Sequence, residues 1–373
     1  MCCGCSACLQ VCPAACISWT EDGEGFLYPV VDLDRCLHCD VCEDVCPMLH
    51  PLPAEEPLDI IGAKNPDEGV RAASSSGGLF SMLADKTLSE GGVVFGAAFD
   101  EEWTVEHVAC ENTGELARLR GSKYLQSLMG DTFREIKKIL TEDRPVLFCG
   151  TSCQAAGLRR LLGREPKLLV ADVVCHSIPS PKVWKQYLNE KAAAKGYAAS
   201  DITRLTFRDK TLGWKDFSVV AVTVDASGKE QEIIRETSRE NAYMRGFLKG
   251  LYSRPACSNC PAKRFTSGAD ITIADFWGAY EFYPAQDDDR GITLAFALTG
   301  KGNETLASLG LDTINVTLMQ ATKHNPRIMS PAEPHPQRDE VFENLGKTHV
   351  EDMVWKYAKP SLKQKITGRL KRK

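Results

Sequence analysis

The chain has 373 residues, of which 43% are hydrophobic and 25% are charged, and its formal net charge is -5. A chain of this length and composition can bury the cores of two domains. Lysines and arginines are spread along most of the sequence, which argues against a protein that binds nucleic acid. No apolar run approaches the roughly 20 residues that cross a bilayer, so we expect no transmembrane segment.

Two cysteine runs lie within the first 50 residues, one followed by Pro13 and the other by Pro47. The second run repeats the first at a constant offset, and both fit the C-x2-C-x2-C-x3-C-P spacing that holds cubane clusters in bacterial ferredoxins. Because the pattern starts at Cys2, we expect no secretory leader, and reduced thiol ligands are typical of the cytoplasm. The sequence therefore predicts a cytoplasmic protein with a two-cluster ferredoxin module.

The fourth cysteine of each ferredoxin run ordinarily binds the other cluster. This rule assigns the first [4Fe-4S] cluster to Cys2, Cys5, Cys8 and Cys46. It assigns the second to Cys36, Cys39, Cys42 and Cys12. Two four-cysteine zinc sites are the alternative, although zinc modules usually pair two C-x2-C units across a longer gap. Cys3, Cys16 and Cys110 lie outside the pattern and are expected to be small packed thiols.

The predicted elements begin with short strands at 17–20 and 26–31 around the turn Asp22-Gly23. A proline-rich linker at 51–57 leads to a second domain. Buried strands are predicted there at 92–99, 146–149, 168–174 and 271–274. They alternate with helix-type periodicity at 79–89, 132–140, 155–162 and 183–195.

A hairpin is predicted at 218–224 and 230–235, around Ser227-Gly228, so we expect a mixed sheet, and a last helix is expected at 340–357. The fold class is therefore α/β, or α+β overall, with a small ferredoxin module and a larger mixed-sheet domain. The predicted domains are 1–50, 59–340 and 341–373.

The end of the chain, 359–373, carries seven basic residues and no acidic one. Its three apolar residues recur every fourth position, so a helix would present a narrow apolar stripe flanked by cations. This pattern is typical of a weak membrane-surface anchor. A solvated tail, or a segment that docks an acidic partner such as ferredoxin, are the alternatives.

A second group of cysteines follows the predicted strands of the large domain. Cys149 and Cys153 come after one strand, Cys175 comes after the next, and Cys257 and Cys260 form a C-x2-C pair. The carboxyl ends of strands are where α/β proteins build their sites. The group can form a third metal cluster, a zinc site or free thiols.

Glycine-rich turns indicate a phosphate-bearing cofactor. The turn at 74–78 precedes a predicted helix, whose first N-H groups and positive dipole end suit a pyrophosphate. The alternative is that Ser76 simply caps the helix. Gly150-Thr151 forms a second such turn, and the sequence contains no G-x-G-x-x-G fingerprint, so a nicotinamide site of the Rossmann type is not expected.

Six ordered motifs resemble the beta subunit of coenzyme F420-reducing hydrogenases and dehydrogenases. They are SSGG at 75–78, RGSKY at 120–124, LFCGTSCQAAGL at 147–158, DVVCHSIPS at 172–180, FRDK at 207–210 and DITIADFWG at 270–278. The resemblance runs from about residue 62 to about residue 342. It implies an FAD and a [4Fe-4S] cluster in the large domain, which pass electrons from clusters to flavin and then as hydride to F420 or another small acceptor.

The resemblance also implies site residues. The implied ligands of the third cluster are Cys153, Cys175, Cys257 and Cys260. Cys149 stands where relatives can have another residue, and Ser152 and Ser177 replace a proline and a glycine that are common in the family. The implied flavin contacts are Ser75, Ser76, Gly77, Gly78, Lys123, Gly150, Thr151 and Gln154. His176 is a candidate proton shuttle, with a structural histidine as the alternative.

The sequence thus predicts an iron-sulfur flavoprotein oxidoreductase. Its expected partners are a ferredoxin or another redox protein and a small molecule that donates or accepts hydride. The family scaffold also serves chlorophyll-derivative reduction and bacterial proteins encoded among surface-polysaccharide genes, so analogy does not select the substrate. An electron-transfer subunit without its own substrate site is the rival hypothesis.

Overall fold

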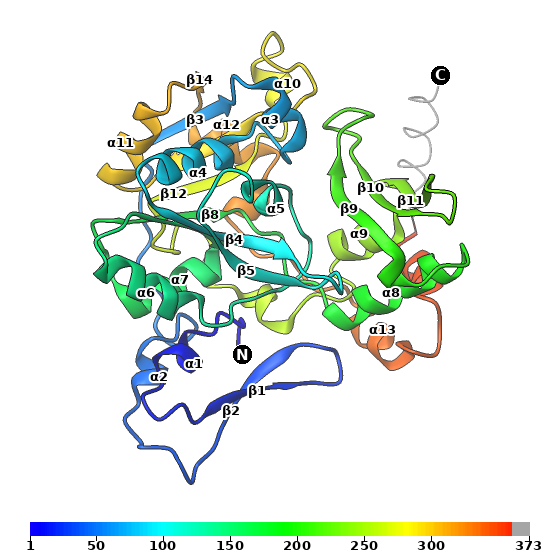
Figure 1. Ribbon diagram of the computed structural model, residues 1–373, viewed down its shortest axis with the longest axis horizontal. Coiled ribbons are helices and arrows are strands. Elements are labelled where there is room, and N and C mark those ends of the chain that lie inside the picture. The colour runs from blue at the N-terminus through cyan, green and yellow to red at the C-terminus, as the bar shows by residue number, and fades with distance from the viewer. Residues whose placement is uncertain (360–373) are drawn as a thin grey trace.

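A large mixed sheet forms the centre of the protein, in a computed structural model that describes residues 1–359 (Figure 1). Its strand order is β14-β3-β13-β12-β8-β7-β4-β5-β6. The strands are β3 (Asp59–Lys64), β4 (Val93–Phe99), β5 (Val105–Cys110), β6 (Ser127–Leu128), β7 (Val146–Thr151), β8 (Leu168–Val173), β12 (Ile271–Asp275), β13 (Thr293–Ala297) and β14 (Asp312–Asn315). The four central strands, from β12 to β4, are mutually parallel.

The central strands are apolar on both faces because helices cover both sides of the sheet. Val94 and Leu147 pack with α4 (Leu79–Ser89) on one face, while Phe95 and Phe148 pack with α6 (Thr132–Thr141) and α7 (Ser152–Leu162) on the other. Shorter helices flank the connections: α3 (Glu68–Ala73), α5 (Leu116–Leu119), α10 (Ala279–Phe282), α11 (Gly300–Ser308) and α12 (Leu318–Lys323). The α/β interpretation is therefore confirmed.

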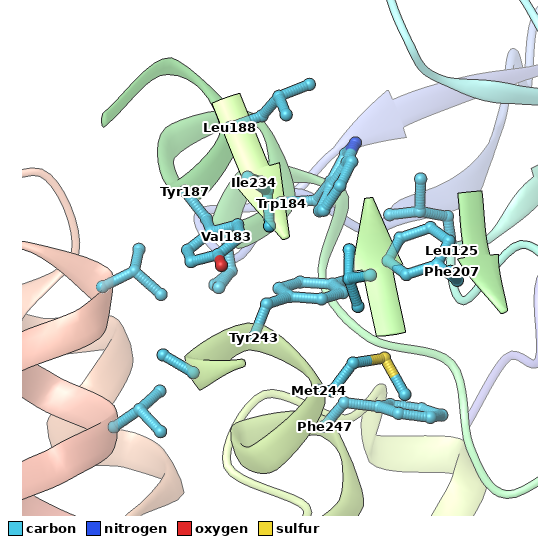
Figure 2. Packing of buried hydrophobic residues seen from close by; sticks show 14 of the residues in the cluster. Leu125, Val183, Trp184, Tyr187, Leu188, Phe207, Ile234, Tyr243, Met244 and Phe247 are labelled. Carbon is cyan, nitrogen blue, oxygen red and sulfur yellow. The ribbon is translucent and has the colours of Figure 1, made fainter. Parts of the chain in front are cut away.

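A second core lies beside the large sheet, around three antiparallel strands. These are β9 (Ile202–Asp209), β10 (Ser218–Val224) and β11 (Glu230–Thr237), and they pack with α8 (Pro181–Ala193) and α9 (Ala242–Leu248). Figure 2 shows the aromatic side chains that meet there. The ring centroids of Trp184 and Tyr243 are 4.8 Å apart, and those of Tyr187 and Tyr243 are 5.6 Å apart.

Two expectations need correction. The hairpin β10-β11 was expected to make the main sheet mixed, but it belongs to the separate three-stranded sheet, and the main sheet is mixed through pairs such as β4-β5 and β12-β13. The single helix expected at 340–357 is wrong as well. The chain forms α13 (Arg338–Asn344) and α14 (Val350–Tyr357), and Gly346 between them has a φ of 79°, a left-handed value that ends a helix.

The cysteine-rich module lies against one edge of the large domain, as the blue segment of Figure 1 shows. It consists of α1 (Ala7–Val11), the antiparallel hairpin of β1 (Ile17–Glu21) and β2 (Leu27–Val31), and α2 (Val41–Asp44). The predicted turn is present, and Asp22 Oδ1 accepts hydrogen bonds from the backbone N-H groups of Glu24 and Phe26. Helix α1 contacts both α6 and α7.

The predicted basic tail lies almost wholly outside the described residues, so its proposed roles stay predictions. None of the helices within residues 1–359 combines the length and apolar character that crossing a bilayer requires.

Candidate functional site

The serine-glycine turn leads directly into α4, as the sequence predicts. Gly78 is the N-cap of this helix, with a φ of 87°, and no side chain caps the helix in the described structure. Ser76 instead donates its hydroxyl to the carbonyl oxygen of Ile292 at 2.8 Å. The interpretation of Ser76 as a helix cap is therefore wrong, and the first N-H groups of α4 stay available for a ligand.

Residues from three other motifs fix this turn in place. Arg208 donates to the Ser75 carbonyl at 2.9 Å and forms an ion pair with Asp275 at 2.8 Å. The backbone N-H of Ser122 donates to Ser75 Oγ at 2.6 Å, and Lys210 Nζ donates to the Ser76 carbonyl at 3.1 Å. The predicted site residues do not include Arg208, although it belongs to the FRDK motif at 207–210.

A cavity of about 280 Å³ opens beside the turn, at the carboxyl ends of β7, β8 and β12. Its lining includes all but one of the predicted flavin residues, namely Ser75, Ser76, Gly78, Lys123, Gly150, Thr151 and Gln154. Gly77 does not line it, and a Cβ there would lie 2.2 Å from the carbonyl oxygen of Ala63. Gly77 is therefore required by close backbone packing.

Gln154 and Lys123 both have structural partners at this cavity. Gln154 Oε1 accepts a hydrogen bond from the backbone N-H of Thr151 at 2.9 Å, which ties the start of α7 to the end of β7. Lys123 Nζ donates to the carbonyls of Arg120 and Gly121 at 3.0 and 3.2 Å. Burial lowers the pKa of Lys123 to about 7, so an anion bound beside it would favour its charged form.

Two histidines contact the cavity in different ways. His107, which the sequence did not single out, is held between Ser127 Oγ at 2.6 Å and the Cys149 carbonyl at 3.1 Å. His176 has a buried Nε2 atom without a hydrogen-bond partner among the described residues. Burial, with the nearby charges of Arg327 and Lys263, lowers the pKa of His176 to about 4, so the ring is neutral at pH 7. Its role as a proton shuttle stays a prediction.

Four cysteines of the second group lie near one another, and one of them, Cys175, lines this cavity. Burial raises the pKa of the Cys175 thiol, and the nearby charges of the other three implied ligands add to the effect. Burial also raises the pKa of Cys257 to about 12 and that of Cys260 to about 11, again with Cys153 as a neighbour. Thiols in such surroundings become thiolates only beside positive charge, which iron would supply. Cys149 lines the cavity and is not among these neighbours.

Several of the ferredoxin cysteines lie near one another. Burial raises the pKa of Cys8 to about 11, and the nearby charges of Cys2, Cys46 and Cys42 raise it further, although Cys42 is a predicted ligand of the other cluster. Burial also raises the pKa of Cys42, and the nearby charge of Cys12 adds to this effect. Within residues 1–359, no group of three histidine, cysteine, aspartate or glutamate side chains surrounds a common point. A single zinc ion requires such a group. A cubane does not, because it binds each thiolate at a different iron. The individual ligand assignments stay predictions.

Two family models match the chain. The 4Fe-4S dicluster domain matches residues 1–49, and the model for the C terminus of the coenzyme F420 hydrogenase/dehydrogenase beta subunit matches residues 143–320. Residues 143–320 are therefore similar to the C-terminal part of an F420 hydrogenase/dehydrogenase beta subunit. The resemblance found in the sequence is thereby confirmed, and the chain is an iron-sulfur electron-transfer protein related to that beta subunit.

The chain is also similar to a chain of the F420-reducing [NiFe] hydrogenase complex from Methanosarcina barkeri. The two share 15% sequence identity and a TM-score of 0.48, over 84% of this chain and 94% of the other. A comparison with curated protein sequences finds no match.

The ferredoxin module meets the large domain through cysteine contacts. The Cys3 thiol contacts the thiols of Cys5 and Cys153, which belong to the predicted first and third clusters. The sequence predicts only a packed thiol at Cys3, because Cys153 is distant in the chain and only the tertiary structure brings it to Cys3. Cys16 also lies beside a predicted cluster ligand, with its Sγ 3.4 Å from that of Cys12.

Arg254 holds the two parts of the chain together. Its guanidinium group donates to the carbonyls of Cys2 and Leu27, both at 2.7 Å, and to Gln126 Oε1 at 2.9 Å. It also lies over the ring of Tyr28, 4.5 Å from the centroid. The side chain is 1% exposed. A planar, permanently charged group with several donors suits this junction, because it satisfies three acceptors at once.

Proposed function

We propose that the chain is an oxidoreductase that binds FAD in the 280 Å³ cavity and exchanges electrons between its [4Fe-4S] clusters and a small organic substrate. One observation carries this proposal. Cys175 lines the cavity and also belongs to the group of four cysteines that suits the third cluster. A cofactor in the cavity would therefore lie against a cluster ligand, where single electrons need to cross only a short distance.

The residues around the cavity fit a flavin dinucleotide. Bound FAD would supply the conversion between single-electron and hydride transfer. The uncapped N-terminus of α4 offers N-H groups and a positive dipole end to the pyrophosphate. Lys123 is placed to neutralise a phosphate or the charge of the reduced ring, and His176 presents an unpaired ring nitrogen.

The contact through Cys3 supports an order for the clusters. The first cluster would lie next to the third, and the third next to the flavin cavity, which leaves the second cluster outermost. Cys39, a predicted ligand of that outermost cluster, is exposed. A ferredoxin or another redox protein would therefore exchange electrons at this end. The matched family is named for coenzyme F420, which makes F420 the first candidate substrate, and a substrate from surface-polysaccharide metabolism is the second.

Anaerobic purification followed by iron, sulfide and flavin analysis tests the proposal. We expect about twelve iron atoms and one FAD per chain, and we expect the dithionite-reduced protein to reduce oxidised F420 or another free acceptor. Protein that holds the clusters and no flavin would contradict the proposal. Flavin that is reduced and yet inert toward free acceptors would favour the rival hypothesis of an electron-transfer subunit.

The affinity for FAD is expected to depend on pH through Lys123. Its pKa in the free protein is about 7, and a bound anion raises it, so FAD binding takes up a proton above pH 7. The dissociation constant should therefore rise with pH above 7, by at most about tenfold per pH unit. Fluorescence titrations between pH 6 and pH 9 measure it. Lys123→Met should bind FAD more weakly at pH 6 and show a flat profile, and an equally steep profile in this variant would rule Lys123 out.

A further inference from the structure

A second cavity of about 580 Å³ adjoins the flavin cavity. The two share part of their lining, which includes Tyr124, Val174, His176, Phe247 and Asp275. Met244 and Phe247 of α9, which lie next to each other in Figure 2, also line the second cavity. A molecule in the second cavity would therefore reach the flavin cavity past His176 and Phe247.

The lining of this second cavity is strongly basic. Six cationic side chains face one carboxylate, Asp275, which is already paired with Arg208. The six are Arg208, Lys215, Arg239, Arg245, Lys249 and Arg327. Lys215 and Arg239 have ion-pair partners elsewhere, in Asp287 and Asp216. So many cations around one cavity create a positive potential that attracts anions.

Three of the six cations have no carboxylate within ion-pair distance among residues 1–359, namely Arg245, Lys249 and Arg327. The remaining residues, 360–373, contain no aspartate or glutamate that could complete a pair. Arg245 lies with its guanidinium group 5.3 Å from the centre of the Trp355 ring, and Nε donates to the carbonyl of Ala358. These contacts position the group without neutralising its charge.

Unpaired polar atoms gather at the same cavity. Among the described residues, His176 Nε2, Arg208 Nε and Arg245 Nη2 are buried without a hydrogen-bond partner, and all three side chains line it. Such atoms are rare because each lost hydrogen bond destabilises the fold, and a bound ligand is a common reason for them. The Trp277 ring adds an apolar wall, stacked on Trp214 with ring centres 4.3 Å apart.

We propose that this cavity binds the acidic end of an anionic organic substrate, through a carboxylate or phosphate group held by Arg245, Lys249 and Arg327. The apolar part of the substrate would lie against Trp277 and extend past His176 into the flavin cavity. Its role in hydride exchange rests on the function proposed above. The binding of anions itself depends only on the residues that line the second cavity.

Calorimetric titration of the anaerobic full-length protein tests the proposal, with pyrophosphate and citrate as separate probes. We expect saturable binding of at least one of them, weakened at least tenfold in Lys249→Gln and further in the double variant with Arg245→Gln. Lys249 is exposed, so its replacement should leave the fold intact. Tighter binding of pyrophosphate would identify a phosphate-bearing substrate, and tighter binding of citrate a carboxylate-bearing one.

Lys229→Gln is the matched control. Lys229 is an exposed lysine beside the β10-β11 turn, and it does not line the cavity. The proposal would be overturned if the parent, the Lys249→Gln variant and the double variant bound the probes with equal affinity. It would also be overturned if neither probe showed saturable binding. Flavin content is measured on the same samples. Flavin-free protein that still binds the probe in a Lys249-dependent way would contradict the proposed function and leave the anion site standing.

Discussion

Replacing Cys257 by serine is expected to remove the third cluster, and with it about four of about twelve iron atoms per chain. The thiol lies among the three other predicted ligands of this cluster, and it accepts a hydrogen bond from the Ile178 N-H at 3.3 Å. Loss of the cluster interrupts the route between the ferredoxin module and the cavity. The reduction of bound flavin by reduced ferredoxin should therefore slow by on the order of a hundredfold or more.

Iron and sulfide analysis and the rate of flavin bleaching measure the effects of the Cys257→Ser change. Cys110→Ser is the matched control, because Cys110 is a buried cysteine of β5 that donates to the Asn112 carbonyl at 3.1 Å, a bond that a hydroxyl group can keep. The control should retain all its iron. If the Cys257→Ser variant retained its iron and its rate as well, Cys257 would be a structural thiol.

Replacing Arg254 by methionine should detach the ferredoxin module from the large domain. The change leaves three acceptors without their donor, namely the carbonyls of Cys2 and Leu27 and the amide oxygen of Gln126. Leaving buried acceptors unpaired costs about 3 kcal/mol or more in total. We expect faster proteolysis within the linker at 51–57, and we expect electron transfer from the module to the flavin to be lost while both parts keep their cofactors.

The Arg264→Met variant is the matched control for Arg254→Met. Arg264 is exposed and donates its Nε to the Met329 carbonyl at 3.1 Å. Its replacement should change neither the proteolysis pattern nor the electron transfer. A parent-like pattern in Arg254→Met would show that other contacts between α1 and the large domain are sufficient to hold the module.

Local patterns predicted most of the secondary structure well. The helix expected at 79–89 is α4 (Leu79–Ser89), and the strand expected at 92–99 is β4 (Val93–Phe99). These segments have strong periodicity and glycine at their borders, so nearby residues determine their limits. Seven of the eight residues predicted to contact a flavin line one cavity, because several of the motifs that contain them follow the ends of neighbouring strands.

Local sequence patterns could not predict the contacts between distant segments of the chain. The sequence gives no sign that β10-β11 would pair only with β9, or that Cys3 would meet Cys153. Likewise, the cations of the second cavity come from segments far apart in the chain, such as Lys249 and Arg327. These residues do not form a sequence motif, because only the tertiary packing brings them together.

The close fit between α1 and α7 has a consequence for how the protein is made. Gly157 of α7 leaves so little room that a Cβ there would lie 2.9 Å from Cys5 Sγ, and Cys5 is only 6% exposed. A scaffold protein that delivers iron and sulfide could not reach this thiol once the two helices are in contact. We therefore expect the first cluster to be inserted before the module docks, so that docking selects against protein that lacks this cluster.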